Sequence, residues 1–469
     1  MLSNYLQAIF VLLIVSTIVF LFRRKRFDAL FVGGAATVVY FMPGIVGSIQ
    51  FPYGGDAGFY ASPVVPGAYA VMFVVVATLL VVTFCYDKIV ARQAIGEWAI
   101  ADRHAPELLC LAMLCGAAMS IATTGKGFLC VEKADMLARI NPWYYLASYS
   151  APLAFVSALS ARKWWVVAAA TAMLLCDLFI GFRAAAAVTF IGVCLLYGPS
   201  LFGSWKSRIR FVAGVVVVAV GLFVIKQLAW NIKYTVSVDC PPLPVASHTP
   251  LGAGAAAGAV VAAQQAAAEQ ALAAAPTEIH IDNLANTAKL LGHRNVYLDA
   301  LRYSEPMVIG SILNETVRRE FRIPLRDVID QALSGVPAGK SVFGIDVSDV
   351  PLFSARFGPV LFPRVTFGMA SNPWAQAYAA GGFPLVFGFA LVYASCLAAF
   401  AAFAQAVPPG TRGLLAVAVG WWGFYLHRND VLTQVGIMKM TVYLAVAAVL
   451  VSLAVSGAAK FRQIVLGHH

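Results

Sequence analysis

Charged residues are scarce in this chain of 469 residues. Asp, Glu, Lys and Arg make up 12% of it, whereas a soluble domain carries about 25%. Apolar residues make up 61%, which is more than a soluble core can bury. Repeated apolar runs match the roughly 20 residues that cross the hydrocarbon layer of a bilayer. The composition therefore predicts a polytopic membrane protein.

The sequence also lacks the common motifs of soluble enzymes. It contains no HExxH, nucleophile elbow, GxGxxG or DxD-like carboxylate pair, and its 8 cysteines are not spaced as in a zinc site. The segment from Gly335 to Ser341 has the wrong glycine spacing for a nucleotide loop. We therefore expect no metal, nucleotide or other cofactor. The net charge of +11 is explained by topology and lipid headgroups, so no nucleic acid is expected as a partner.

The pattern predicts an all-α polytopic membrane protein with about eleven transmembrane helices and a large, partly helical extracytoplasmic loop. The expected helices lie near residues 5–22, 29–48, 67–86, 108–124, 143–161, 164–182, 184–199, 211–229, 374–404, 414–427 and 437–456. Basic residues fall on alternate loops, which the positive-inside rule places in the cytoplasm. The amino terminus then lies outside and the carboxyl terminus inside. The first segment is expected to be a retained helix and not a signal peptide.

Three parts follow from this topology. Residues 1–229 form an N-terminal membrane part, residues 230–365 an extracytoplasmic loop, and residues 366–469 a C-terminal membrane part. The Ala-rich stretch 251–275 is nearly long enough to span, but its Gln and Glu residues favour a low-complexity loop or surface helix.

Two further features are expected outside the membrane. Cys130 and Cys240 both fall in outer loops, where an oxidising compartment would allow them to pair. Within the large loop, apolar residues recur at helical spacing, with Asn314 or Ser311 as candidate caps. The arginines off this stripe either reach lipid headgroups or form a solvated basic face.

Arg183 follows Gly181 and Phe182 at the outer junction of two apolar segments. A permanent charge at a membrane boundary is a functional candidate, and the guanidinium suits phosphate oxygens. The alternative is an anchor that extends to the headgroups.

Arg428 occupies a similar position at the outer end of the tenth segment. It is a second candidate for phosphate binding, with Asp430 or His427 as a candidate proton acceptor or orienting group. A helix-end cap is the alternative. Lys126, in the outer loop after the fourth segment, is a candidate to face an anion, with interhelical salt bridges as the alternative.

Several motifs, in their order along the chain, resemble those of the O-antigen and enterobacterial common antigen type repeat-unit polymerases of bacterial inner membranes. They are Gly125–Leu129, Gly181–Arg183, His293–Asn295, Pro337–Lys340, Asn372–Phe383 and Arg428. The likeness runs from about residue 110 to residue 445, and the order and topology of the motifs carry it.

The resemblance implies a GT-C-like glycosyltransferase at the periplasmic face of the bacterial inner membrane. It would move a growing glycan from undecaprenyl pyrophosphate onto an incoming lipid-linked repeat unit. Membrane lipids, a chain-length regulator and a flippase are the other candidate partners, and no cofactor is implied because the donor is already activated.

The residues then take two roles. The pyrophosphate would be bound by Arg183, Arg294, Lys340, Arg364, Arg428 and Lys126. The candidates for the general base are Glu315, His293 and Asp430. Two alternatives stay open, namely an O-antigen ligase that passes the glycan to the lipid A core, and a lipid-linked oligosaccharide transporter or flippase. A structural or scaffold role is a third.

Overall fold

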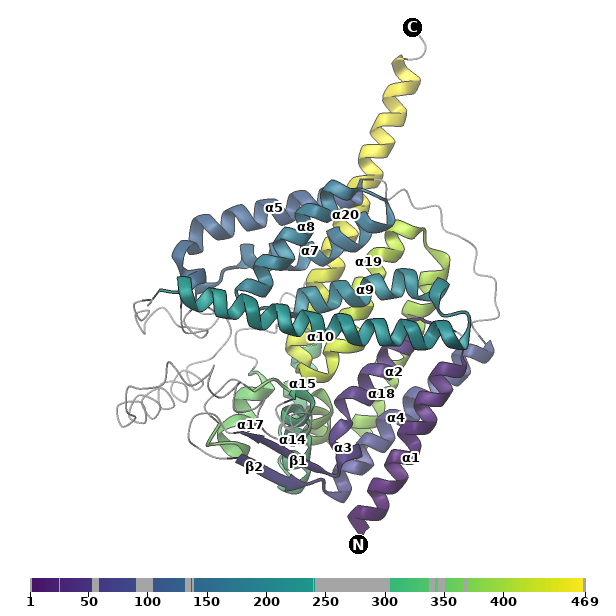
Figure 1. The fold of residues 1–469 in the computed structure, drawn as a ribbon, viewed down its shortest axis with the longest axis vertical. Coiled ribbons are helices and arrows are strands. Elements are labelled where there is room, and N and C mark those ends of the chain that lie inside the picture. The colour runs from purple at the N-terminus through teal and green to yellow at the C-terminus, as the bar shows by residue number, and fades with distance from the viewer. Residues whose placement is uncertain are drawn as a thin grey trace.

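The computed structural model describes residues 2–24, 26–52, 59–89, 104–130, 136, 139–238, 240, 304–336, 342–344, 351–365 and 369–466. Within these residues the fold is almost entirely helical, with one two-stranded sheet. The two ends of the chain lie at opposite ends of the view in Figure 1. His293, Arg294, Lys340 and the stretch 251–275 lie outside the described residues.

The elements keep the labels of Figure 1. In the first half of the chain they are α1 (Leu2–Arg23), α2 (Ala29–Tyr40), α3 (Met42–Val46), β1 (Ser48–Pro52), β2 (Phe59–Pro63), α4 (Pro66–Ile89), α5 (Ala105–Thr124), η1 (Gly125–Leu129), α7 (Pro142–Ser160), α8 (Trp164–Phe179), α9 (Ala184–Leu201) and α10 (Trp205–Val236). In the second half they are α14 (Glu305–Arg318), α15 (Leu325–Leu333), α17 (Phe353–Leu361), α18 (Pro373–Ala406), α19 (Pro409–Val419), the π-helical turn η4 (Gly420–Phe424), the 3-10 turn η5 (Tyr425–Arg428) and α20 (Val431–Leu466).

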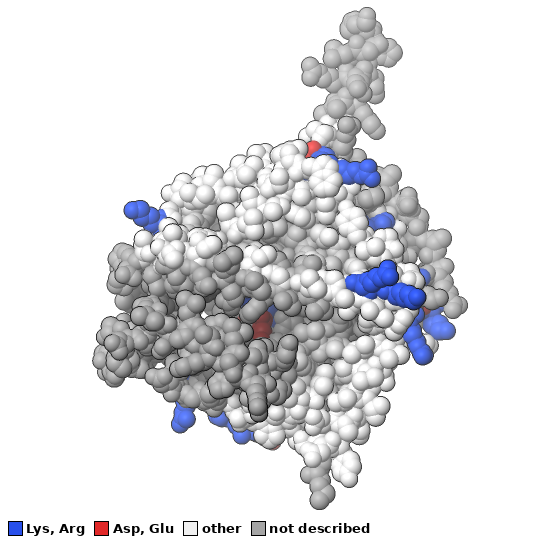
Figure 2. Space-filling view, viewed as in Figure 1, with Lys and Arg blue, Asp and Glu red and all other residues white. Residues whose placement is uncertain are grey.

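Several helices are able to cross a membrane. The described residues contain six that are long and apolar enough, namely Ser3–Arg23, Pro66–Ile89, Ala105–Leu129, Ala184–Leu201, Pro373–Ala406 and Val431–Ser456. Two shorter apolar helices are Ala29–Tyr40 and Trp164–Phe179. Helical residues lie at each expected segment, but a count of eleven spans is not confirmed. In Figure 2, most of the described surface on the visible face carries no charge, which suits contact with lipid tails.

Basic residues from the predicted cytoplasmic loops form ion pairs between helix ends. Arg24, just after α1, contacts Asp28 at 2.8 Å and Asp87 at 2.7 Å, and its side chain is almost fully buried. Lys163 pairs with Glu107 and joins the start of α8 to the start of α5. These contacts tie helices together at the ends that carry the positive loops.

A β-hairpin at the other ends of α3 and α4 was missed by the sequence analysis. Strands β1 and β2 pair in antiparallel register, with Phe51 opposite Tyr60. Phe51 and Tyr60 are buried and their rings stack at 4.9 Å. The hairpin follows α3, where Pro43 has no N–H to continue the hydrogen bonding of α2.

Helix α14 was expected in the large loop, and its core-facing stripe is confirmed. Ile309, Ile312 and Leu313 are buried in the main hydrophobic cluster. The caps were wrong, because Ser304 is the N-cap residue and Asn314 lies inside the helix. Asn314 instead accepts a hydrogen bond from the backbone N–H of Val65 at 2.8 Å. Helix α14 therefore packs its apolar face into the protein, while Arg318 and Arg319 at its end remain about half exposed.

Candidate site at the outer helix ends

Arg183 is the N-cap residue of α9, after a tight turn from α8. Gly181 has φ of +95°, a conformation that favours glycine. The backbone N–H of Phe182 donates to the carbonyl of Asp177 at 2.7 Å, and the ring of Phe182 packs on Tyr144 at 5.4 Å. This turn fixes the backbone of Arg183 between α8 and α9, and its side chain is about half exposed.

Arg428 ends the irregular turns that follow α19. The helix changes to a π-turn at Gly420 and then to a 3-10 turn, which ends at Arg428 before α20 begins. The guanidinium of Arg428 lies 5.3 Å from the centre of the Tyr425 ring. Its side chain is 26% exposed, so that a solute can reach it.

Glu305 joins these two arginines. Nη2 of Arg183 donates to Oε2 of Glu305 at 2.5 Å, and Nη1 of Arg428 forms an ion pair with Oε1 at 2.8 Å. Glu305 is the first residue of α14, where a negative charge interacts favourably with the helix dipole. The structure thus brings two of the predicted phosphate-binding arginines to the two oxygens of one carboxylate.

Sequence reasoning did not select Glu305. The signal was present, because Ser304, Glu305 and Pro306 form a typical helix start with an acidic residue in the first turn. That signal explains a helix end and does not indicate a partner far along the chain. Tyr40, at the end of α2, was missed as well; its ring stacks on that of His427 at 5.3 Å.

Glu315 lies near the far end of α14, ten positions from Glu305, which places their backbone positions about 15 Å apart along the helix axis. Oε2 of Glu315 accepts from Nη2 of Arg318 at 2.6 Å and from Nε of Arg319 at 2.9 Å, and Oε1 accepts from the hydroxyl of Tyr60. Its side chain is fully buried. Burial first, and then the bond to Glu315, raise the pKa of Tyr60 above its usual value.

Asp430 is held by backbone groups. Its Oδ1 accepts from the N–H of Thr433 at 2.8 Å, and its Oδ2 accepts from the N–H of Phe353 at 3.2 Å. The first contact is the capping bond of α20, and the second ties α17 to that cap. The side chain is 2% exposed. This arrangement matches the helix-cap alternative that the sequence left open for Asp430.

His427 is packed among aromatic and hydroxyl groups. Nε1 of Trp374, which can only donate, points at Nδ1 of His427 at 3.0 Å. Nδ1 must therefore accept, so the neutral ring carries its proton on Nε2, which lies 3.2 Å from Oγ1 of Thr37. Because Nδ1 is occupied and the residue is buried, His427 supports the turn under Arg428 and does not face a substrate.

The remaining described candidates lie at different places. Lys126 is exposed in η1, and Phe128, two residues later, packs on Tyr144 at 5.8 Å. The ring of Tyr144 also contacts Phe182, so the turn that carries Lys126 and the turn before Arg183 pack on the same residue. Arg364 is exposed and follows Phe362, which packs on Tyr60, so Arg364 belongs to the Glu315 end of α14.

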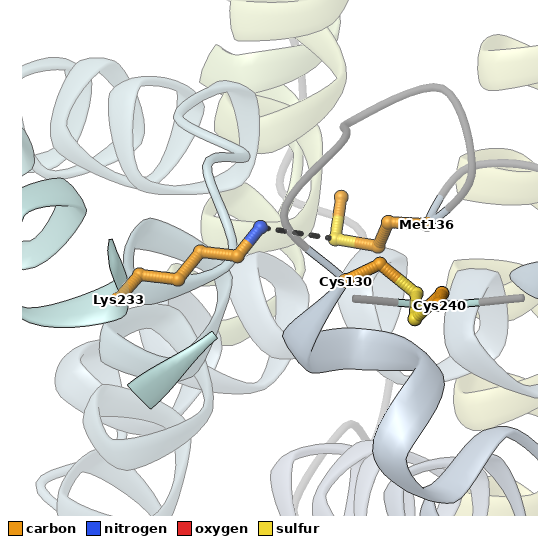
Figure 3. Close-up of a disulfide and its surroundings, with 4 residues drawn as sticks. All are labelled: Cys130, Met136, Lys233 and Cys240. Carbon is orange, nitrogen blue, oxygen red and sulfur yellow. Dashed lines mark hydrogen bonds between the residues drawn. A yellow bond between two sulfur atoms is a disulfide. The ribbon is translucent and has the colours of Figure 1, made fainter. Parts of the chain in front are cut away.

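A disulfide joins Cys130 and Cys240, as the sequence analysis suggested (Figure 3). The Cα atoms are 5.4 Å apart, and the N–H of Val238 donates to the carbonyl of Leu129 at 2.9 Å beside it. Between the two cysteines the chain passes through α7, α8, α9 and α10. Cys130 and Cys240 belong to the same hydrophobic cluster as Ile180 and Phe182, so the turn before Arg183 lies beside the disulfide.

Comparisons of this chain with protein-family models, with curated protein sequences and with solved structures give no match.

Proposed function

We propose that this protein is a membrane-embedded glycosyltransferase that polymerises undecaprenyl-pyrophosphate-linked repeat units at the outer face of the bacterial inner membrane. The observation that carries the proposal is the convergence of Arg183 and Arg428 on one carboxylate, Glu305. Two guanidinium groups that already hold two oxygens of an anion are spaced to hold the oxygens of a diphosphate.

The chemistry needs such a site. When the glycan leaves its lipid carrier, the bond between the anomeric carbon and the phosphate oxygen breaks, and the electron pair stays on the diphosphate. Fixed positive groups that meet this charge stabilise the transition state more than the ground state. Arg183 and Arg428 are fixed by the Gly181 turn and by η5, and both remain partly exposed.

The position of the site supports the same proposal. The arginines lie at the ends of helices that share a side with the Cys130–Cys240 disulfide, a bond that forms in an oxidising compartment. The diphosphate of a polyprenyl lipid lies at the headgroup level, where helix ends are found. Lys126, at the same edge, adds a further cation for the lipid diphosphate.

The test is a polymerisation assay with the purified full-length protein in lipid nanodiscs. The substrate is a fluorescent lipid-linked repeat unit from cells that make the protein. We expect a ladder of products that each differ by one repeat unit. Transfer to lipid A core would indicate the ligase, and movement between leaflets without a chemical change would indicate a flippase. A substrate that neither reacts nor moves would exclude all three.

A further inference from the structure

We propose that Glu305 is exchanged for the donor diphosphate at Arg183 and Arg428, and that the released carboxylate then takes the proton from the acceptor hydroxyl. The inference rests on the proposed function and deepens it, because it names the general base and couples its release to donor binding. Glu305 is in this view a catalytic residue, not a structural counter-ion.

The surroundings of Glu305 differ from those of the other carboxylates in this region. Glu315 is fully buried and receives bonds from Tyr60, Arg318 and Arg319. Asp430 is occupied by two backbone N–H groups. Glu305 is 23% exposed, and the partners of its two oxygens are the same two arginines that a diphosphate would need. Arg183 and Arg428 can therefore exchange Glu305 for an anion that carries more negative charge.

The charges favour this exchange. Two arginines and one carboxylate leave a net charge of +1 at the cluster, whereas a lipid diphosphate brings more negative charge and more acceptor oxygens than a carboxylate. Once the diphosphate is bound, Glu305 lies beside an anion of like sign. Repulsion then moves its side chain away from the arginines while its backbone stays fixed at the start of α14.

The released carboxylate completes the reaction. The oxygen of the acceptor hydroxyl forms the new bond to the anomeric carbon, and its proton passes to Glu305. The bond between the anomeric carbon and the diphosphate breaks, and the leaving diphosphate keeps the electron pair and its contacts to the arginines. Without bound donor, Glu305 remains paired, so that the base is available only when there is a glycan to transfer.

Glu305→Gln separates this role from a structural one. The amide keeps the size of the side chain but has no charge and cannot accept the proton. We expect a fluorescent polyprenyl diphosphate to bind roughly fivefold more tightly, because its competitor for the arginines loses its charge. We also expect kcat to fall on the order of 100-fold or more, because the base is gone. Inorganic pyrophosphate should displace the probe, which shows that the headgroup is what binds.

The matched control is Glu107→Gln, which removes a carboxylate that pairs with Lys163 between the starts of α5 and α8. It should leave both the dissociation constant and kcat unchanged. A structural counter-ion predicts the opposite sign for Glu305→Gln, namely weaker binding because the arginines lose their fixed positions. If Glu305→Gln bound the polyprenyl diphosphate more weakly, or bound it more tightly but kept the wild-type kcat, the proposed role of Glu305 would be overturned. Polymer formation by the wild-type protein would still support the proposed function. If the wild-type protein makes no polymer, the proposed function itself fails.

Discussion

Arg183 and Arg428 contact opposite oxygens of the carboxylate of Glu305, at 2.5 and 2.8 Å. One arginine caps α9 and the other ends the turns before α20, so the contact joins the N-terminal and C-terminal helices through α14. This three-residue bridge is the basis of the functional proposal.

Replacement of either arginine with Ala should stop chain growth. We expect Arg183→Ala and Arg428→Ala each to reduce polymer formation by about 100-fold to 1,000-fold, since one fixed donor to the leaving group is lost. Lipid A core that carries a single repeat unit should remain. It can be measured by gel separation of the cell-surface glycan.

Arg326→Ala is the control for these variants, because Arg326 is 88% exposed and pairs loosely with Asp330 at 3.4 Å. It should leave the glycan unchanged. Full-length glycan from Arg183→Ala or Arg428→Ala, at normal expression, would remove that residue from the site.

The disulfide should contribute to stability. Cys130 and Cys240 are separated by 110 positions, and closing a loop of this length restricts the unfolded chain. We expect Cys130→Ser to lower the free energy of unfolding by about 2–4 kcal/mol. Cys240→Ser and the double variant should lower it equally, in thermal melts of the detergent-solubilised protein.

Cys115→Ser is the control, because Cys115 is a free, exposed cysteine of α5. It should leave the melt unchanged. If a membrane-impermeant thiol reagent labelled Cys130 in intact cells without prior reduction, the bond would be absent in the cell.

Tyr60→Phe should destabilise the region where the β1–β2 hairpin packs on α14. It leaves Oε1 of the buried Glu315 without its donor, which costs about 1–3 kcal/mol. The raised pKa of Tyr60 adds a pH dependence. The bond from Tyr60 to Glu315 contributes fully to the free energy of unfolding below pH of about 10, the usual pKa of tyrosine. This contribution is lost as the pH rises toward the pKa of Tyr60 in the folded protein.

The measurement is a series of thermal melts from neutral to alkaline pH. The wild-type protein should lose more stability above pH of about 10 than Tyr60→Phe does. Tyr197→Phe, at an exposed position of α9, serves as the control. Parallel alkaline losses in wild type and Tyr60→Phe would show that Tyr60 does not carry the effect.

Gly382 should not tolerate a side chain. Its φ of 65° and ψ of −153° lie in a region open essentially to glycine alone, and they produce the break in α18. We expect Gly382→Ala to lower the free energy of unfolding by about 1–3 kcal/mol. Gly388→Ala should have little effect, because Gly388 lies in the helical part after the break and an added Cβ would meet no atom within 4 Å. Equal melting temperatures for the two variants would argue against strain at Gly382.

Some of the site followed from the sequence. Charge on alternate loops placed Arg183 and Arg428 at helix ends on one side of the bundle, because the chain must return to the same side after every second pass. The helical stripe of α14 was readable for a similar reason, since Ile309, Ile312 and Leu313 repeat at helical spacing.

The carboxylates could not be assigned in this way. Glu305, Glu315 and Asp430 each lie near a helix end in the structure, and the sequence gives no sign of which distant partner each meets. Helical spacing puts Arg318 and Arg319 within reach of Glu315, but only packing decided that Tyr60 donates to Glu315 and that Glu305 meets arginines from two distant helices. Such contacts depend on how helices are arranged around one another, which the periodicity of one helix does not record.

By itself, the sequence determined that this protein is built from apolar helices and that its arginines gather at their ends, since burial in lipid and the siting of charge are local properties. Only the tertiary structure decided that Arg183 and Arg428 share Glu305 and that Asp430 caps a helix. The physical reason is that an ion pair requires two groups at one point in space, and that point is set by the packing of whole helices.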